Sequence, residues 1–307
     1  MKNNPLVLSI VMPTHNKRKD AQRCIAALLE QDFPYGLFEI VVVDDGSSDD
    51  TPECLPGTNT GEVPFKYCRL PGLGPACARN EGIRNAQAPI IAFIDDDAVP
   101  QEGYLKAIYD PFADESVVGV EGKVVPVQCE DMGLLGMSPR SLEGGVYLTC
   151  NIAFRTAALK TIGGLDESFP YPAFEDVDLA EAIKPLGKIV WAPAAEVHHP
   201  CRRWSLQRAI REIRFNEPLL LFTRRYGFLG WEEKKTTWPI LSIYLSAVIK
   251  LPLGRVWKGL KGCFGRRPLQ ALEYTFISAM QGLLASVLVI RPILKGLRAE
   301  VARKKYL

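Results

Sequence analysis

The most constraining feature of this chain is the alternation of short apolar runs with helical spacing over residues 6–94. The apolar runs are strand-like at 6–12, 38–43 and 90–94, and residues 17–31 and 75–87 between them carry apolar side chains at helical spacing. Strand, helix and strand in succession form a βαβ unit, which implies parallel strands with helices on both faces. The sequence therefore predicts an α/β fold with a mostly parallel sheet.

Polar side chains follow each of these apolar runs. Thr14 follows the first, Asp44 the second, and the carboxylates Asp95–Asp97 the third. Ligands of such sheets bind outside the carboxyl ends of the strands, so these side chains are expected to share one site. Three adjacent carboxylates repel one another and lose hydration on burial, and a divalent cation is the simplest compensation. The alternative is a solvated acidic loop.

The rest of the first 200 residues gives a mixed pattern. Residues 56–74 are rich in Gly and Pro and are predicted to form a loop, whereas 117–127 are strand-like. Helical spacing returns at 152–162, before Gly163-Gly164, and at 175–184, before Pro185.

Charge divides the chain into two regions. Residues 1–200 hold 16 Lys/Arg and 29 Asp/Glu, whereas residues 201–307 hold 21 and 6, although the net charge of the whole is only +2. A chain of 307 residues that is 47% hydrophobic can form a full core and an appendage. The split in charge predicts that the two regions have different functions.

The basic region contains two apolar stretches, at 238–249 and 274–290. A membrane span needs about 20 apolar residues, so neither stretch is long enough for a clear one. Basic flanks together with Trp231, Trp238 and Trp257 suit helices that lie on an anionic membrane surface. The alternative is a helical hairpin packed on the rest of the chain or on a second copy in a homodimer. Nucleic-acid binding is disfavoured, because no aromatic stacking module is present.

The eight cysteines show no CxxC pair and no regular spacing, and the N-terminus carries no basic, apolar leader. We expect reduced thiols in a cytoplasmic protein and no zinc site.

The motifs of residues 6–226 together resemble those of family 2 glycosyltransferases of the GT-A type. They occur in that family's order, as Ser9-Ile-Val-Met-Pro-Thr14-His-Asn16, Val41-Val-Val-Asp44-Asp45-Gly-Ser-Ser-Asp-Asp-Thr51, Ala78-Arg79-Asn80-Glu-Gly82, Asp95-Asp-Asp97, Gly163-Gly-Leu-Asp166-Glu-Ser-Phe169, Phe174-Glu175-Asp176-Val-Asp178-Leu and Val197-His198-His199. The resemblance implies a GT-A-type, Rossmann-like domain at 1–227, followed by the basic, apolar helical region at 228–307. It also implies inverting transfer of a sugar from a nucleotide diphosphate donor to an acceptor hydroxyl.

The resemblance implies a cofactor, Mn²⁺ or Mg²⁺, that offsets the charge on the leaving diphosphate. Asp97 matches the direct metal ligand, and Asp95 matches a group near the ribose or a metal-bound water. His198 corresponds to the family's late histidine and is the predicted second ligand, with His199 as the competing choice. An imidazole ligand favours Mn²⁺ over Mg²⁺.

Asp176 matches the general base for the acceptor hydroxyl, and Glu175 a group that orients or binds the acceptor. The alternative for both is stabilisation of a helix N-terminus by acidic side chains. Thr14, Asp44 and Arg79 match nucleotide contacts. An Asp-Gly turn is the alternative for Asp44, and a surface position is the alternative for Arg79.

Arg203 is a candidate for contact with the leaving diphosphate. Processive synthases of the family carry Gln-x-x-Arg-Trp, whereas this chain has only Arg211-Glu-Ile-Arg214-Phe215, so transfer of a single sugar is favoured. The implied donor carries UDP, dTDP or GDP. The expected acceptor is a lipid-linked or cell-envelope glycan, used by an enzyme that is peripheral on the inner face of the cell membrane.

Two other functions remain open. One is a non-catalytic, membrane-associated scaffold of the same fold. The other is a haloacid-dehalogenase-like phosphatase, because Asp95-x-Asp97-x-Val99 fits the signature of that class, with Asp95 as nucleophile.

Overall fold

The computed structural model describes residues 5–130, 132–169, 173–212, 251–263 and 269–281. The chain divides into two compact units. Unit 1 comprises Met1–Gln128 and Ser138–Pro200, and unit 2 comprises Cys129–Met137 and Cys201–Leu307. Unit 2 therefore takes a short internal segment as well as the basic region. The boundary expected at residue 227 lies among 213–250, outside the described residues, and stays a prediction.

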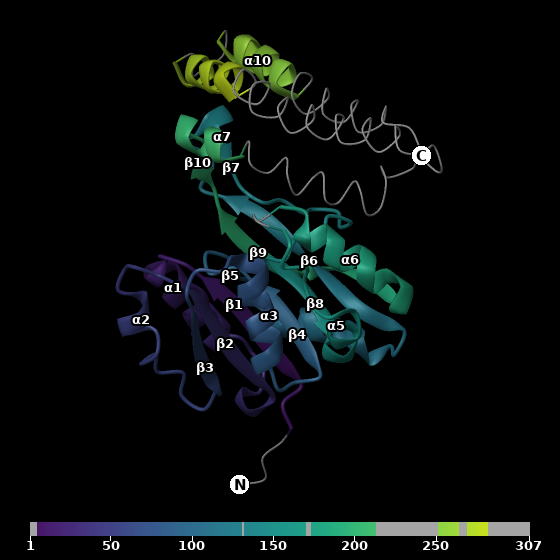
Figure 1. Cartoon of the computed structure of the whole chain (residues 1–307). Helices are drawn as coiled ribbons and strands as arrows, with labels where there is room; N and C mark the ends of the chain where they lie inside the picture. The colour runs from purple at the N-terminus through teal and green to yellow at the C-terminus, as the bar shows by residue number, and fades with distance from the viewer. Residues whose placement is uncertain (1–4, 131, 170–172, 213–250, 264–268, 282–307) are drawn as a thin grey trace, which may run out of the picture. The chain divides into compact units, whose positions relative to one another are not determined.

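Unit 1 is built on one eight-stranded sheet with helices on both faces (Figure 1). Its strands lie in the order β3 (Phe65–Leu70), β2 (Phe38–Asp45), β1 (Leu8–Thr14), β4 (Ile90–Ile94), β8 (Asn151–Arg155), β6 (Val117–Val127), β9 (Lys188–Pro200) and β5 (Val99–Pro100). The first four strands of this order pair in parallel, β8 is antiparallel to both neighbours, and β6 pairs in parallel with β9. The predicted mostly parallel α/β sheet is confirmed.

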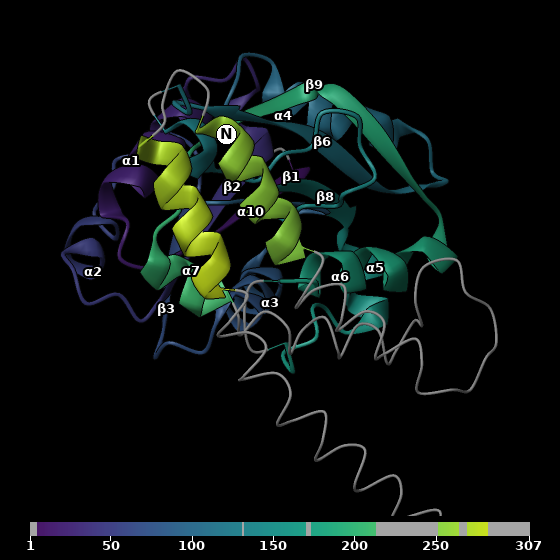
Figure 2. The same ribbon diagram turned by 90° about the horizontal axis from the view of Figure 1, so that it is seen from above.

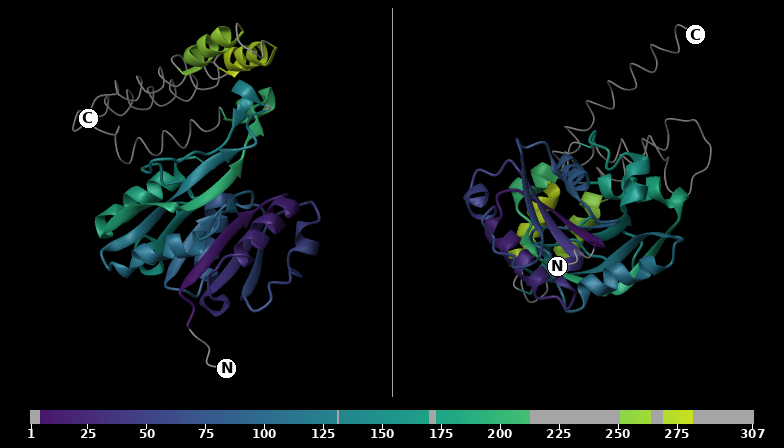
Figure 3. Two further views of the ribbon diagram at one scale, coloured as in Figure 1. Left: turned by 180° about the vertical axis from the view of Figure 1, so that it is seen from behind. Right: turned by 90° about the horizontal axis from the view of Figure 1, so that it is seen from below.

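Successive side chains of each strand face opposite sides of the sheet, and this gives unit 1 two separate cores. In β1, Leu8, Ile10 and Met12 face one core, and Val11 faces the other. Residues of α1 (Arg18–Leu29) and α4 (Tyr104–Tyr109) fill the first core, and residues of α3 (Pro75–Asn85), α5 (Thr156–Ile162) and α6 (Glu175–Ile183) fill the second. These helices lie on opposite sides of the sheet (Figure 2; Figure 3). The shorter helical segments of unit 1 are α2 (Thr51–Cys54), η1 (Tyr35–Leu37), η2 (Asp110–Ala113) and η4 (Lys184–Leu186).

Two segments differ from the expected elements. The predicted loop at 56–74 contains β3, a half-exposed strand at the sheet edge whose pattern is hidden by flanking Gly and Pro. The predicted helix at 152–162 begins as strand β8, and α5 starts only at Thr156. Ile152, Ala153 and Phe154 are fully buried where β8 pairs with β4 and β6, so tertiary pairing outweighs local helical spacing.

Unit 2 has a small core of its own. Its described elements are η3 (Gly133–Leu135), β7 (Gly136–Met137), β10 (Arg202–Arg203), α7 (Leu206–Glu212), α10 (Leu251–Gly262) and a helix at 269–281. The Trp204 side chain is fully buried, with the Tyr274 ring 5.4 Å away and the Arg255 guanidinium 5.3 Å from its ring centre. The helix at 269–281 packs closely on α10, since a Cβ at Gly259 would lie 2.1 Å from Thr275 Oγ1.

Cys129 and Cys201 form a disulfide, with their Cα atoms 5.2 Å apart. The expectation that all thiols are reduced is therefore wrong for this pair, and the other six cysteines are free. A separation of 72 residues leaves no local sequence signal, so only the fold reveals the pairing.

No helix within the part of the chain that the structure describes is long and apolar enough to cross a membrane. The first apolar stretch, 238–249, lies outside the described residues, as does 282–290 of the second.

Candidate active site

The three polar strand ends meet at one edge of the sheet, as the sequence predicts. Thr14 at the end of β1 is in register with Asp44 near the end of β2, and β4 pairs with β1 from the other side. Asp95–Asp97 directly follow β4. The strand order thus brings side chains from three separate motifs to one place.

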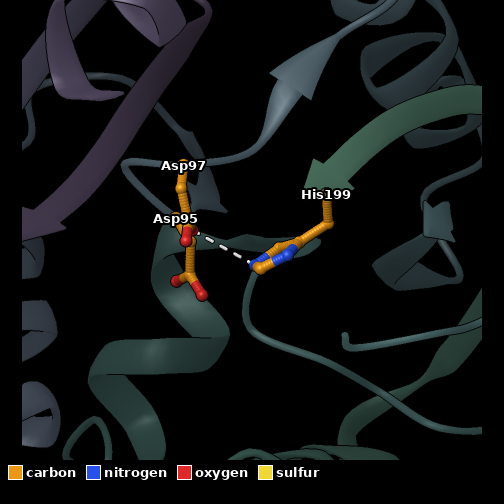
Figure 4. A group of neighbouring side chains, drawn as sticks. All are labelled: Asp95, Asp97 and His199. Atoms are coloured by element: carbon orange, nitrogen blue, oxygen red, sulfur yellow. Dashed lines mark ion pairs between the residues drawn. The ribbon is translucent and has the colours of Figure 1, made fainter. Parts of the chain in front are cut away.

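Asp95, Asp97 and His199 form a compact group that suits a metal ion (Figure 4). Their ligand atoms all lie within 4.8 Å of one another, and His199 Nε2 lies 3.1 Å from Asp97 Oδ1. Asp97 and His199 are buried. Two carboxylates and one imidazole supply hard oxygen donors and one nitrogen, a donor set that fits Mn²⁺ better than Mg²⁺.

The structure selects His199 rather than His198 for this group. His198 Nε2 is instead 2.8 Å from Glu196 Oε1, and its side chain is 34% exposed. The prediction favoured His198, whereas the structure places the competing choice, His199, beside the carboxylates. Burial lowers the pKa of His199, but the hydrogen bond and charge of Asp97 outweigh burial and raise it. A bound cation would displace that proton.

Lys17, at the start of α1, supplies positive charge to the same site. Its Nζ lies 2.8 Å from Asp96 Oδ1 and 3.1 Å from Asp97 Oδ2. Burial raises the pKa of Asp96 to about 6, although Lys17 lowers it. The sequence analysis placed Asp96 at this edge without a role of its own, and it did not identify Lys17. The sequence position of Lys17 could have indicated it, because Lys17 directly follows the Thr14-His-Asn16 motif at the end of the first strand.

The predicted nucleotide contacts Thr14 and Asp44 are turned into the protein. Thr14 Oγ1 donates to Asp96 Oδ2 over 2.8 Å, and Asp44, which is fully buried, accepts hydrogen bonds from Ser47 N and Tyr67 Oη. The Asp-Gly turn expected as an alternative for Asp44 is therefore present. Its residue Gly46 has φ +77°, and a Cβ there would lie 2.7 Å from the next loop's backbone nitrogen.

Arg79 on α3 is buried, and it joins the strand-end carboxylates to α6. Its guanidinium donates to Asp95 Oδ1 over 2.9 Å and lies 3.5 Å from Glu175 Oε1. Burial alone would lower the pKa of Arg79, but the charges of Asp95 and Glu175 raise it. Burial raises the pKa of Glu175 to about 7, with Arg79 acting in the opposite direction. The surface position considered for Arg79 is excluded.

Asp176 lies in the first turn of α6 beside this buried pair. Its Oδ1 accepts a hydrogen bond from Val177 N, and the side chain is more accessible than that of Glu175. Burial raises its pKa, against the lowering effect of that backbone hydrogen bond. The two acidic neighbours therefore differ. Glu175 faces Arg79, whereas Asp176 is the more accessible of the two.

Two further residues are Arg203, which the sequence predicts as a diphosphate contact, and Glu121, which it does not single out. Arg203 belongs to unit 2, where it pairs with Glu273, so its predicted contact with a diphosphate stays a prediction. Glu121 on β6, which the sequence analysis missed, is buried and accepts hydrogen bonds from the Ser141 hydroxyl and from the backbone N–H groups of 145–147. It fixes the loop that leads into β8.

Comparison with known proteins gives a consistent result. Residues 9–155 match the family model for glycosyl transferase family 2. Glycosyltransferase AglE of Haloferax volcanii is 32% identical over 105 residues, covering 32% of this chain and 33% of that protein. The pre-mycofactocin glycosyltransferase of Mycobacterium tuberculosis is 27% identical over 232 residues, covering 66% of this chain and 45% of that protein. The chain thus spans less than half the length of these two relatives.

Among solved structures, the mannosyltransferase PcManGT from Pyrobaculum calidifontis, in complex with GDP-Man and Mn²⁺, has a TM-score of 0.62. It is 19% identical, and the likeness covers 93% of this chain and 89% of that chain. At this identity the likeness shows the fold, and the expected GT-A-type architecture is confirmed.

Proposed function

We propose that the chain, whose residues 9–155 match the family model for glycosyl transferase family 2, is a member of that family. It transfers a single sugar, with inversion, from a nucleotide diphosphate sugar to an acceptor hydroxyl. The observation that carries the proposal is the group of Asp95, Asp97 and His199 at the carboxyl edge of the sheet. A divalent cation held by these three side chains would stabilise the negative charge that develops on the departing diphosphate. The Mn²⁺ complex of the mannosyltransferase supports this choice of cofactor.

Asp176 is the proposed general base. Its carboxylate takes the proton of the acceptor hydroxyl while the hydroxyl oxygen attacks the anomeric carbon and the bond from that carbon to the diphosphate breaks. The diphosphate leaves as an anion, so no general acid is required, unlike in glycoside hydrolysis. Burial raises the pKa of Asp176 and so makes it a better base than an exposed aspartate.

Glu175 and Arg79 hold the helix turn that carries Asp176 in place. The ion pair between them fixes the first turn of α6 relative to Asp95. Glu175 Oε2 is buried and has no hydrogen-bond partner among the described residues, so an incoming acceptor hydroxyl would satisfy it. This supports the predicted role of Glu175 in orienting the acceptor.

Thr14 and Asp44 shape the nucleotide site in this proposal. Thr14 holds Asp96, and Asp44 builds the turn at 44–47, whose backbone lies at the same sheet edge. A donor with UDP, dTDP or GDP is retained, and the GDP-Man complex of the mannosyltransferase supports a donor of this class.

We further propose a lipid-linked or envelope glycan as acceptor, reached by binding to an anionic membrane surface on the cytoplasmic side. Unit 2 exposes large apolar side chains on two helices, beside the exposed lysines Lys258 and Lys261. These apolar residues are Trp257, Leu260, Leu269, Leu272 and Phe276. Apolar side chains beside cationic ones suit an anionic interface. The alternative, a homodimer formed through the same face, would appear as a doubled mass in light scattering.

The first experiment is thermal unfolding of the whole protein with UDP, dTDP or GDP, each with Mn²⁺ or with EDTA. A bound ligand raises the melting temperature by mass action. We expect one nucleotide to raise it only when Mn²⁺ is present, and the shift to be lost in Asp97→Asn. Asp114→Asn, at an exposed carboxylate outside the site, is the matched control.

The outcomes separate the remaining alternatives. A metal-dependent shift, followed by release of the same nucleotide from its sugar donor when acceptor glycan is added, supports the transferase. The absence of any shift would favour the non-catalytic scaffold. The phosphatase alternative is not favoured, because Asp95 follows the fourth strand of a nucleotide-sugar transferase fold rather than the first strand.

A further inference from the structure

His199 is held through both of its ring nitrogens. Nε2 faces Asp97, whereas Nδ1 lies 3.2 Å from Ser138 Oγ and 3.3 Å from the carbonyl oxygen of Pro200. The Ser138 hydroxyl donates to the carbonyl oxygen of His199 itself over 3.2 Å. Its oxygen is then available to accept from Nδ1–H. We assign this tautomer, which leaves the Nε2 lone pair directed at the metal group.

The chain around His199 is tied to the segment that includes Ser138. Cys129 is the first residue of unit 2 after β6, and Cys201 is the first after β9. Near their ends, β6 and β9 are paired in parallel, with Pro126 opposite His199 and Val127 opposite Pro200. The disulfide joins the two segments of the chain immediately beyond this pairing.

Backbone pairing continues from the disulfide. Met137 and Gly136 pair antiparallel with Arg202 and Arg203, and Trp204 N donates to the carbonyl oxygen of Leu135 over 2.7 Å. We call residues 129–130, 132–138 and 199–204, with the disulfide between Cys129 and Cys201, the clasp. Of the residues in the clasp, Ser138 and His199 belong to unit 1.

We propose that the Cys129–Cys201 disulfide is a positioning element for the metal site. By fixing the end of β9 against the end of β6, it keeps His199 at Asp97, and its reduction weakens metal binding. The inference rests on the metal site of the proposed function. In the reduction, a dithiol gives up two electrons and two protons, the S–S bond breaks to two thiols, and the dithiol becomes a cyclic disulfide.

The physical basis is the position of His199 close to the end of a ladder, because β6 and β9 pair only as far as Val127 and Pro200. His199 depends on its neighbours for ring orientation, and loss of a group that hydrogen-bonds to a ligating histidine typically lowers metal affinity by about 10- to 100-fold. Beyond the end of the ladder, the restraints between the two segments other than the cross-link include the two-residue ladder of β7 and β10 and the hydrogen bond from Trp204 N to Leu135 O. We expect reduction to weaken Mn²⁺ binding by about tenfold.

The test measures Mn²⁺ affinity by the electron paramagnetic resonance signal of free Mn²⁺, with no sugar donor present. The whole protein is compared as oxidised wild type, as wild type reduced with dithiothreitol and then desalted without oxygen, and as Cys129→Ser/Cys201→Ser. Cys54→Ser, at a free cysteine on α2, is the matched control. The reduced wild type keeps the test valid if the double variant does not fold, because no residue is replaced in it.

The inference is supported if the reduced protein and the double variant bind Mn²⁺ about tenfold more weakly, while Cys54→Ser matches oxidised wild type. Equal affinity of oxidised and reduced protein, with weakened binding in His199→Ala, overturns the role of the clasp and leaves the proposed function standing. Absence of Mn²⁺ binding in oxidised wild type overturns both. Mass spectrometry of alkylated protein that finds Cys129 and Cys201 as thiols after aerobic purification also overturns the inference.

Discussion

The neighbouring residues His198 and His199 show how far a single position along a strand decides chemistry. Successive side chains of a strand point to opposite faces, so only one of the two can meet Asp97. The register of β9 against β6 shifts between Gly122–Ala192 and Lys123–Glu196, which leaves residues 193–195 unmatched. Such an irregularity changes which face each later residue occupies. The sequence alone could therefore propose both histidines but could not choose between them.

His199→Ala is expected to weaken Mn²⁺ binding at least about tenfold, because it removes a ligand atom from the group. His198→Ala should change the affinity by less than about twofold, since the His198 side chain is hydrogen-bonded to Glu196 and not directed at the metal group. Titration calorimetry with Mn²⁺ on the whole protein measures both. A larger loss in His198→Ala than in His199→Ala would contradict the assignment.

Glu175 is expected to make folding stability depend on pH. Burial raises its pKa to about 7 in the folded protein, whereas an unfolded chain titrates Glu near about 4.3. The folded state thus holds the proton more tightly. Its stabilising contribution is complete below about pH 4.3 and is lost as the pH rises through about 7. Between pH 5 and 8 the loss amounts to about 2–3 kcal/mol of unfolding free energy.

Urea unfolding at pH 5 and pH 8 checks this prediction. Glu175→Gln cannot ionise, so its stability should fall less than that of wild type over this interval. Glu181→Gln, on the same helix but paired with Lys184 at the surface, should behave as wild type. An identical pH slope in wild type and Glu175→Gln would show that Glu175 does not titrate in this range.

At the scale of elements, the strand ends that form the site could be predicted from the sequence, whereas the long-range hydrogen bonds that support the site could not. The grouping of Thr14, Asp44 and Asp95–Asp97 follows from the βαβ pattern, because parallel neighbours end at the same edge. Glu121 carries no such signal. It reads as an isolated acid in an apolar strand, and its partners at 141–147 are defined only by the folded loop.

Glu121→Gln tests that support. The carboxylate accepts from a hydroxyl and three backbone N–H groups, and an amide must turn an N–H₂ donor toward one of these donors. We expect a loss of about 1–3 kcal/mol in unfolding free energy, measured by guanidinium denaturation. Glu143→Gln, at an exposed position in the same loop, should lie within about 0.5 kcal/mol of wild type. Equal stability of the two variants would show that the loop does not depend on Glu121.

At the scale of the whole molecule, the uneven charge could be read from the sequence, and the structure adds an exposed surface to it. The basic region contributes Lys258 and Lys261 beside the exposed apolar side chains of unit 2. Exposed apolar side chains grouped on these described helices favour a partner, and the charge favours an anionic one. Which residues of the region stay exposed could not be predicted, because both faces of the helix at 269–281 carry apolar side chains.

Vesicle sedimentation tests the proposed membrane surface. The protein should bind vesicles that contain phosphatidylglycerol more strongly than pure phosphatidylcholine, and added salt should weaken the binding. Lys258→Gln/Lys261→Gln should bind about 30-fold more weakly, since each lysine near the surface contributes about 1 kcal/mol and the pair therefore about 2 kcal/mol. Lys66→Gln/Lys160→Gln, at exposed lysines of unit 1, is the charge-matched control. An equal effect of the two pairs would indicate a general charge effect instead of a docking face.

The internal segment Cys129–Met137 affects both recombination with related proteins and the products of proteolysis. Neither unit is one continuous stretch, so no single crossover in recombination can transplant either of them intact into a relative. A swap needs junctions on both sides of that segment as well as at residue 200. A protease nick within it would yield two fragments that migrate together on a gel until a reducing agent breaks their covalent link.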